Sequence, residues 1–109
     1  MKSVKIDCSS INDWDSFHSL FQTTMGFPDF YGNNMNAWID CMTYLDEDDG
    51  MSLVKVEKGT VLVLELENSK KLKEQHRDIY DALVECSSFV NYRRIDLGEP
   101  AVLALSFHH

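Results

Sequence analysis

Long apolar runs are missing from this sequence of 109 residues. No stretch approaches the roughly 20 consecutive apolar residues that a membrane-spanning helix needs. The first residues, Met1 to Lys5, lead into a charged segment and not into the apolar core of a signal peptide. We therefore expect a cytoplasmic protein without a membrane partner.

Cysteine is scarce, with three residues that lie far apart in the chain. Cys8, Cys41 and Cys86 form no Cys-x-x-Cys pair, and their odd number does not suit a disulfide framework. The same spacing argues against a zinc knuckle. We expect reduced, partly buried thiols, no metal and no cofactor.

Positive charge is also scarce, because ten Lys and Arg residues stand against eighteen Asp and Glu residues, for a net charge of −8. Such a chain repels phosphate, so we expect no direct nucleic-acid binding and a basic protein as partner. The segment 91–94, Asn-Tyr-Arg-Arg, places two arginines side by side. We expect its arginines to pair with nearby carboxylates.

Catalytic and metal-binding patterns are weak. His18 lies off the main apolar stripe of its helix and has no evident partner, which favours a surface or hydrogen-bonded histidine. The acidic run Asp46-Glu47-Asp48-Asp49 resembles the start of a calcium loop. The loop's fifth and sixth positions would be Gly50 and Met51, where an oxygen ligand and a glycine are needed. We expect a solvated acidic turn and no enzyme.

The residues that are present indicate a globular α/β domain, which we expect to span residues 1–109 as a single unit. Alternating or apolar runs predict strands at 4–7, 60–66 and 101–107. Helical periodicity separates them, which favours a small parallel sheet of three or four strands. Two of the predicted strands, 60–66 and 101–107, carry apolar side chains on both faces. We therefore expect both faces of these strands to be buried. Residues 52–57 form either an edge ribbon or an irregular segment.

Three helices are predicted from caps and apolar spacing. Asn12, with Asp15 three positions later, resembles a capping arrangement before the first helix. Asn33 or Asn34 can cap the second helix. Residues 68–69, Asn-Ser, can cap the third, whose apolar pattern has a gap near His76 that indicates a break or an exposed start.

The second helix has two faces of different character. Met35, Trp38 and Met42 recur at intervals of three and four residues and form the side expected to face the core. A second side carries one carboxylate among small polar and branched apolar groups, which suits recognition of a partner. Its members are Asn36, Ile39, Asp40 and Thr43.

The segment from Pro28 to Thr43, PDFYGNNMNAWIDCMT, resembles the pattern P-x-[YF]-Y-G-x-N-x-x-A-x-x-D-x-[LM]-T of the barstar family of intracellular ribonuclease inhibitors. The flanking elements match in order over residues 1–86 and again at the last strand. The resemblance implies a three-stranded parallel sheet packed with helices. It also implies a function, in which carboxylates occupy the site where a basic ribonuclease holds RNA phosphate.

The resemblance assigns Asp40 as the central carboxylate and implies an inhibitor that is monomeric when free. Three positions depart from the family pattern: Asn36 replaces an acidic residue, Phe30 a tyrosine and Ile39 a tryptophan. The chain therefore resembles a barstar-related subfamily, and a fold module with a non-ribonuclease partner stays open as the alternative. The expected partner contacts are Phe30, Gly32, Asn34, Met35, Asn36, Ala37, Ile39, Asp40, Thr43 and Glu85.

Overall fold

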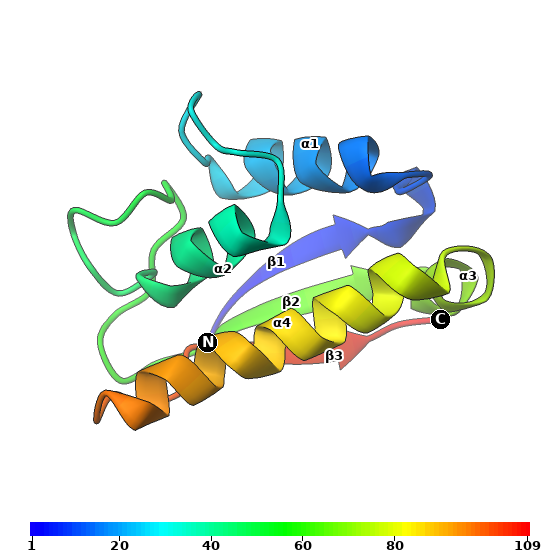
Figure 1. The fold of residues 1–109 in the computed structure, drawn as a ribbon. Helices are drawn as coiled ribbons and strands as arrows, with labels where there is room; N and C mark the ends of the chain where they lie inside the picture. Colours follow the sequence, from blue (N-terminus) through cyan, green and yellow to red (C-terminus); the bar gives the residue numbers. More distant parts are fainter.

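The computed structural model describes all of residues 1–109 and contains three strands and four α-helices. A pair of α-helices lies between successive strands (Figure 1). A short 3-10 turn, η1 (Cys8–Ser10), follows the first strand. The elements are β1 (Lys2–Asp7), α1 (Trp14–Met25), α2 (Met35–Thr43), β2 (Leu62–Glu67), α3 (Ser69–Gln75), α4 (Arg77–Asp96) and β3 (Leu103–Phe107).

The sheet has three parallel strands in the order β1-β2-β3, so β2 is central. Its register places Leu64 opposite Val4 on one side and Leu105 on the other. This confirms the α/β fold with a three-stranded sheet. Residues 52–57 add no fourth strand. Instead, the Val56 amide donates to the Leu45 carbonyl at 3.0 Å, which ties this irregular segment to the turn after α2.

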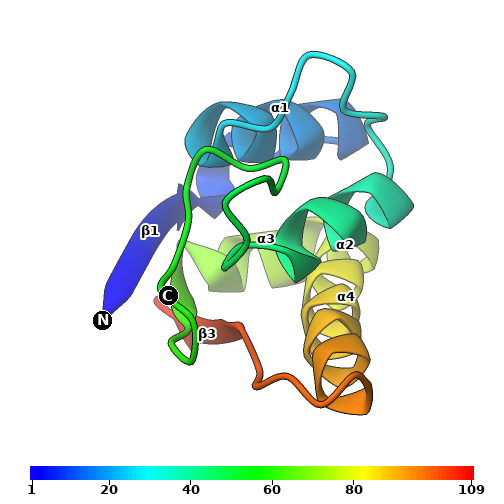
Figure 2. The ribbon, with the colours of Figure 1, turned by 90° about the vertical axis from the view of Figure 1, so that its left-hand side faces the viewer.

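The molecule has two layers, because α1, α2 and α4 all lie on one side of the sheet (Figures 1 and 2). In β2 the leucines face the helices and are buried, whereas Val63 and the glutamates between them are only partly buried. In β3 only Leu103 is buried. The expectation that 60–66 and 101–107 are buried on both faces is therefore wrong. Short apolar side chains such as Ala104 face the side of the sheet that these helices leave uncovered.

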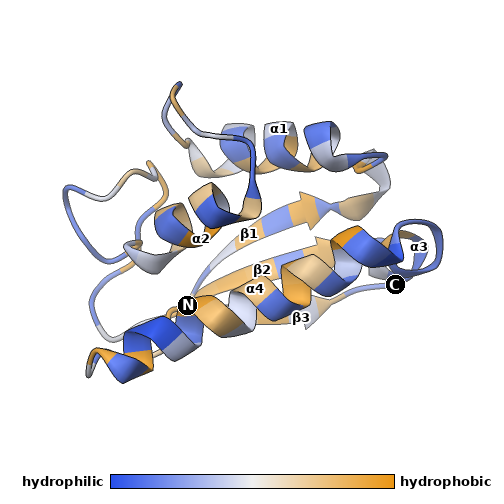
Figure 3. Ribbon diagram, viewed as in Figure 1, coloured by the Kyte–Doolittle hydropathy of each residue, from blue (hydrophilic) through white to orange (hydrophobic).

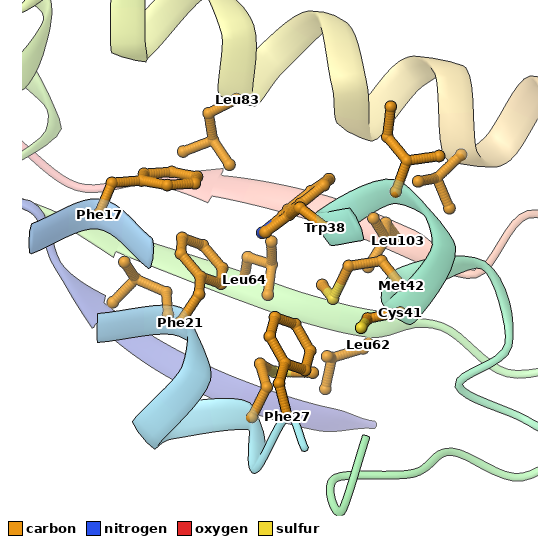
Figure 4. Packing of buried hydrophobic residues seen from close by; sticks show 14 of the residues in the cluster. Phe17, Phe21, Phe27, Trp38, Cys41, Met42, Leu62, Leu64, Leu83 and Leu103 are labelled. Carbon is orange, nitrogen blue, oxygen red and sulfur yellow. The ribbon is translucent and has the colours of Figure 1, made fainter. Parts of the chain in front are cut away.

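The core lies between the sheet and these helices and joins 23 buried apolar residues into one cluster. Trp38 of α2 is fully buried at its centre, and Figure 4 shows its ring among side chains of the sheet, α1 and α4. Its ring meets that of Phe21 of α1 edge to face, with centroids 5.6 Å apart. Burying a ring of this size contributes several kcal/mol, at about 25 cal/mol per Å². Trp38 therefore anchors α2 on the sheet.

Helix α1 begins one residue later than the Asn12 cap predicts. The Asp13 carboxylate accepts from the Ser16 amide at 2.8 Å, and the Ser16 hydroxyl accepts from the Asp13 amide at 3.0 Å. This reciprocal pair satisfies two of the free N–H groups at the helix start. The helix ends at Gly26, whose φ of 69° is left-handed, and a Cβ there would lie 2.6 Å from Leu53. Gly26 thus needs both its conformation and its lack of a side chain.

The expected third helix is two helices, and the break falls at His76 as the sequence predicts. Of the two expected cap positions, Asn68 and Ser69, Asn68 is the N-cap of α3, but its side chain does not cap the helix. Asn68 adopts a left-handed φ of 58°, its side chain makes no capping bond, and it donates to the Asp7 carboxylate at 2.9 Å. Asn tolerates this conformation better than other residues with a side chain, so it can turn the chain from β2 into α3.

Hydropathy varies along and around the helices (Figure 3). The longest helix, α4, alternates between apolar and polar residues along its whole length. None of the helices combines the length and the apolar character that crossing a bilayer requires.

Candidate functional site

The loop before α2, residues 27–34, is held onto α1 by buried polar and aromatic contacts. The Tyr31 hydroxyl lies 2.5 Å from His18 Nδ1, and the Gln22 side chain donates to the Pro28 carbonyl at 3.0 Å. Burial lowers the pKa of His18 and raises the pKa of Tyr31, so both side chains are neutral near pH 7. His18 is buried, which excludes the surface position and confirms the hydrogen-bonded one. The loop therefore has a defined position.

The start of α2 lies at one of the two asparagines that the sequence predicted, Asn33 and Asn34. Asn34 is the N-cap, and its side-chain oxygen accepts from the Ala37 amide at 2.8 Å. Its side-chain nitrogen donates to the Gly32 carbonyl at 3.1 Å. A Cβ at Gly32 would lie 3.2 Å from that nitrogen, so a larger residue would press on the cap. Asn34 and Gly32 thus orient the loop relative to the helix.

A small hollow of about 120 Å³ lies where this loop meets α2. It brings together Phe30, Gly32, Ala37 and Asp40, four of the residues that the sequence predicted as partner contacts. Phe30 leaves 77% of its surface exposed, an unusual position for a ring of this size. Sequence reasoning missed four further lining residues, Pro28, Tyr31, Cys41 and Met51. Met51 lies outside the family motif, and no signal in the sequence points to it.

Asp40 lies at the edge of this hollow with 54% of its side chain exposed. Its Oδ1 accepts from Arg93 Nη1 of α4 at 3.0 Å. The side chain of Arg93 is itself partly exposed, so water screens the pair and the bond contributes little to folding. The pair links α2 to α4 at the surface. Arg93 thus pairs with a carboxylate, as predicted.

The thiol of Cys41, beside Asp40, does not suit nucleophilic chemistry. Burial raises its pKa to about 11, so it stays protonated near pH 7. All three cysteines are free thiols. No group of three or more His, Cys, Asp or Glu side chains is arranged to hold a metal ion.

The family model described as Barstar (barnase inhibitor) matches residues 1–103. The chain belongs to the barstar family. Comparison with curated proteins gives no match. The expected family is therefore confirmed, and the parallel three-stranded sheet with four helices agrees with the barstar fold.

Two expected contacts of this barstar-family chain are not accessible as predicted. Thr43 is only 1% exposed and Ile39 is 8% exposed. The Thr43 hydroxyl donates to the Ile39 carbonyl at 2.6 Å, and the Thr43 carbonyl accepts from Arg94 of α4 at 2.8 Å. The prediction of an open second helix face is therefore wrong at these positions, because both side chains are buried and Arg94 of α4, which packs against α2, bonds to Thr43. The face retains Asn36 and Asp40, which are both exposed.

The other expected contacts of the barstar pattern lie at or near the surface. Met35 and Ala37 in the first turns of α2 are half-buried. Glu85 is exposed on α4, as predicted from its offset to Leu83. It precedes Arg93 by eight residues, which corresponds to about 12 Å along a helix. Glu85 therefore lies along α4 from the Asp40–Arg93 pair and not beside it.

The acidic turn after α2 of this barstar-family chain has a structural role that the sequence did not reveal. Asp46 is buried, and its two carboxylate oxygens accept from Arg94 at 2.9 and 2.8 Å. The hydrogen bonds from Arg94 hold the pKa of Asp46 below its usual value of 3.8. The expected solvated turn is therefore wrong at Asp46, although its neighbour Asp48 is exposed. No local signal marks a partner 48 positions away in the chain.

Proposed function

We propose that this protein inhibits a basic ribonuclease by inserting the Asp40 carboxylate where the enzyme holds an RNA phosphate. The observation that carries the proposal is the exposure of Asp40 in the hollow that Phe30 also lines, within the family's characteristic motif. A carboxylate can accept the same charged hydrogen bonds from Arg, Lys or His that a phosphate accepts. Blocking those groups would leave the ribonuclease unable to bind its substrate.

The free oxygen of Asp40 suits this role. Arg93 occupies Oδ1, and Oδ2 accepts no hydrogen bond within the chain. A guanidinium of the partner can therefore approach Oδ2 without displacing Arg93. The net charge of −8 would attract a basic enzyme before contact and would raise the association rate more than the affinity.

The proposed contact surface extends outward from Asp40. Phe30 would supply apolar area that is already exposed, as in the anchors of many interfaces. Thr43 is left out, since its hydroxyl and carbonyl are both engaged inside the chain. We also propose a non-catalytic protein that acts in the cytoplasm. The remaining proposed contacts are Gly32, Asn34, Met35, Asn36, Ala37, Glu85 and the accessible edge of Ile39.

The proposal is tested by titrating the purified protein against barnase and a panel of other basic ribonucleases while RNA cleavage is measured. We expect stoichiometric loss of activity for at least one enzyme. Asp40→Ala should weaken that complex by about 2 kcal/mol or more, as expected for the centre of an interface. The barnase–barstar pair is itself the standard example of a large loss at a central aspartate, and the altered contacts at Phe30, Asn36 and Ile39 favour a smaller loss here.

The matched control is Asp48→Ala, which removes one exposed negative charge outside the proposed surface. It should slow association slightly and leave the dissociation rate unchanged. Equal losses for Asp40→Ala and Asp48→Ala would mean that only net charge matters and would remove Asp40 from the centre.

A different, non-ribonuclease partner is the second candidate. It is favoured by Asn36, an exposed amide where the family pattern has an acidic residue, and by the positive charge of Arg93 beside Asp40. Both features reduce the negative potential of the surface. If no ribonuclease loses activity at micromolar inhibitor, this second candidate replaces the first.

A further inference from the structure

One side of α4 carries two aromatic residues between two acidic ones. Glu85, Phe89, Tyr92 and Asp96 follow one another at intervals of four, three and four residues, which places them on the same side of a helix. All four residues are exposed. We call these four residues the α4 stripe. It faces away from the core and makes no contribution to the buried apolar cluster.

The two rings of the α4 stripe stack on each other at the surface. Their centroids lie 6.2 Å apart with planes 30° from parallel. Phe89 is 47% exposed and Tyr92 is 63% exposed, so the stack offers apolar area to solvent. Exposed aromatic residues are enriched at the centres of protein interfaces, and stacking limits the entropy that they would lose on binding.

The α4 stripe is continuous with the candidate site. Phe89 precedes Arg93 by one helical turn, and Arg93 donates to Asp40 at 3.0 Å. Helices α2 and α4 pack against each other and run in the same direction (Figure 1). A partner that covers Asp40 therefore has Phe89 next to its footprint.

We propose that the α4 stripe forms part of the surface that binds the basic ribonuclease, an inference that rests on the proposed function. The aromatic rings and carboxylates of the α4 stripe suit the binding of an Arg or Lys side chain of that enzyme. The cation would lie over the Phe89–Tyr92 stack, with the carboxylates of Glu85 and Asp96 at either end of the stripe. The same carboxylates would repel a nucleic-acid backbone. The stack thus supplies the large apolar contact that Ile39 cannot supply from its buried position.

The experiment compares four proteins against the ribonuclease that the wild type inhibits: wild type, Asp40→Ala, the double variant Phe89→Ala/Tyr92→Ala, and Ile95→Ala. Dissociation constants come from titration calorimetry, and thermal unfolding checks the fold of each variant. We expect the double variant to bind roughly tenfold more weakly or worse. Ile95→Ala is the matched control, because Ile95 is 62% exposed on the same helix but lies about a quarter turn from the stripe. Its affinity should stay within about twofold of the wild type.

Each contrary outcome has a distinct meaning. If Asp40→Ala weakens binding and the double variant binds like the wild type, the stripe is not part of the interface, although the proposed function stands. If the wild type inhibits no enzyme in the panel, the proposed function and this inference both fail. If sedimentation detects a dimer of the wild type that the double variant abolishes, the stripe binds a second copy of the chain, and the inference is overturned.

Discussion

Two neighbouring arginines on α4 form ion pairs with two aspartates, one in α2 and one in the turn after it. The two pairs differ in their exposure and in their number of hydrogen bonds. Arg93 and Asp40 meet at the surface through one bond of 3.0 Å. Arg94 and Asp46 meet in the interior through two bonds of 2.9 and 2.8 Å. The exposed pair leaves one carboxylate oxygen for a partner, whereas the buried pair leaves none. We therefore expect the exposed pair to serve binding and the buried pair to serve folding.

Arg94 does more than neutralise Asp46. It also donates to the carbonyls of Thr43 and Pro100, both at 2.8 Å. Three segments of the chain, the end of α2, the acidic turn and the segment before β3, therefore meet at one guanidinium. Arg can serve such a site because its planar group presents five N–H donors.

The largest expected effect is on stability. Asp46→Ala should lower the free energy of unfolding by about 3–5 kcal/mol, because it leaves the Arg94 guanidinium buried without a counter-charge. Asp40→Ala should lower it by about 0.5 kcal/mol or less, as for other exposed pairs. Urea denaturation of both variants measures the difference. Similar losses for the two variants would mean that the distinction between the pairs is wrong.

A smaller effect on stability is expected when the pH is lowered, because Asp46 becomes protonated. The folded-state pKa of Asp46 lies below its usual value of 3.8, so the unfolded chain binds more protons as the pH falls. The stability that this carboxylate contributes is complete above about pH 4 and is lost as the pH falls through the folded-state pKa. Denaturation of the wild type and Asp46→Asn between pH 5 and pH 2 should show a steeper decline for the wild type.

The comparison with Asp46→Asn is needed because other carboxylates respond in the same range. Hydrogen bonds from Ser9 and Ser16 lower the pKa of Asp7 and Asp13 respectively. Both groups are present in both proteins, so their contributions cancel in the difference. Parallel curves for the two proteins would exclude a specific role for Asp46 in acid unfolding.

The smallest expected effect concerns Arg93. Arg93→Gln removes a positive charge beside Asp40 and should speed association with a basic ribonuclease by about two- to fivefold at low salt, with stability changed by no more than about 0.5 kcal/mol. Stopped-flow measurements at two salt concentrations test this, since screening should reduce the gain. The control is Arg77→Gln, because Arg77 is an exposed arginine paired with Asp81 on the same helix. Slower association of Arg93→Gln would mean that Arg93 orients Asp40 for binding.

Sequence reasoning predicted most of the local structure. The Asn34 cap, the break at His76 and the three parallel strands all follow from signals within a few residues of each element. The errors arise where distant segments meet. Helical spacing placed Ile39 and Asp40 on the same side of α2, but it could not show that the fold buries Ile39 and leaves Asp40 exposed.

In the acidic turn after α2, a distant residue likewise decides which side chain is buried. Asp46 and Asp48 look alike in the sequence, in a run of four acidic residues. Only the approach of Arg94, 48 positions later, makes Asp46 a buried partner and leaves Asp48 at the surface. A pattern of charges identifies residues that can pair, but not the pairs.

The sequence by itself determined the start of α2, the family motif from Pro28 to Thr43 and the excess of negative charge, because caps, turns and composition depend on neighbouring residues. The tertiary structure alone decided that Asp40 is exposed, that Thr43 is buried and that Arg93 of α4 pairs with Asp40 of α2. The physical reason is that burial depends on which distant segment packs against a given side of a helix, and local spacing carries no information about that segment.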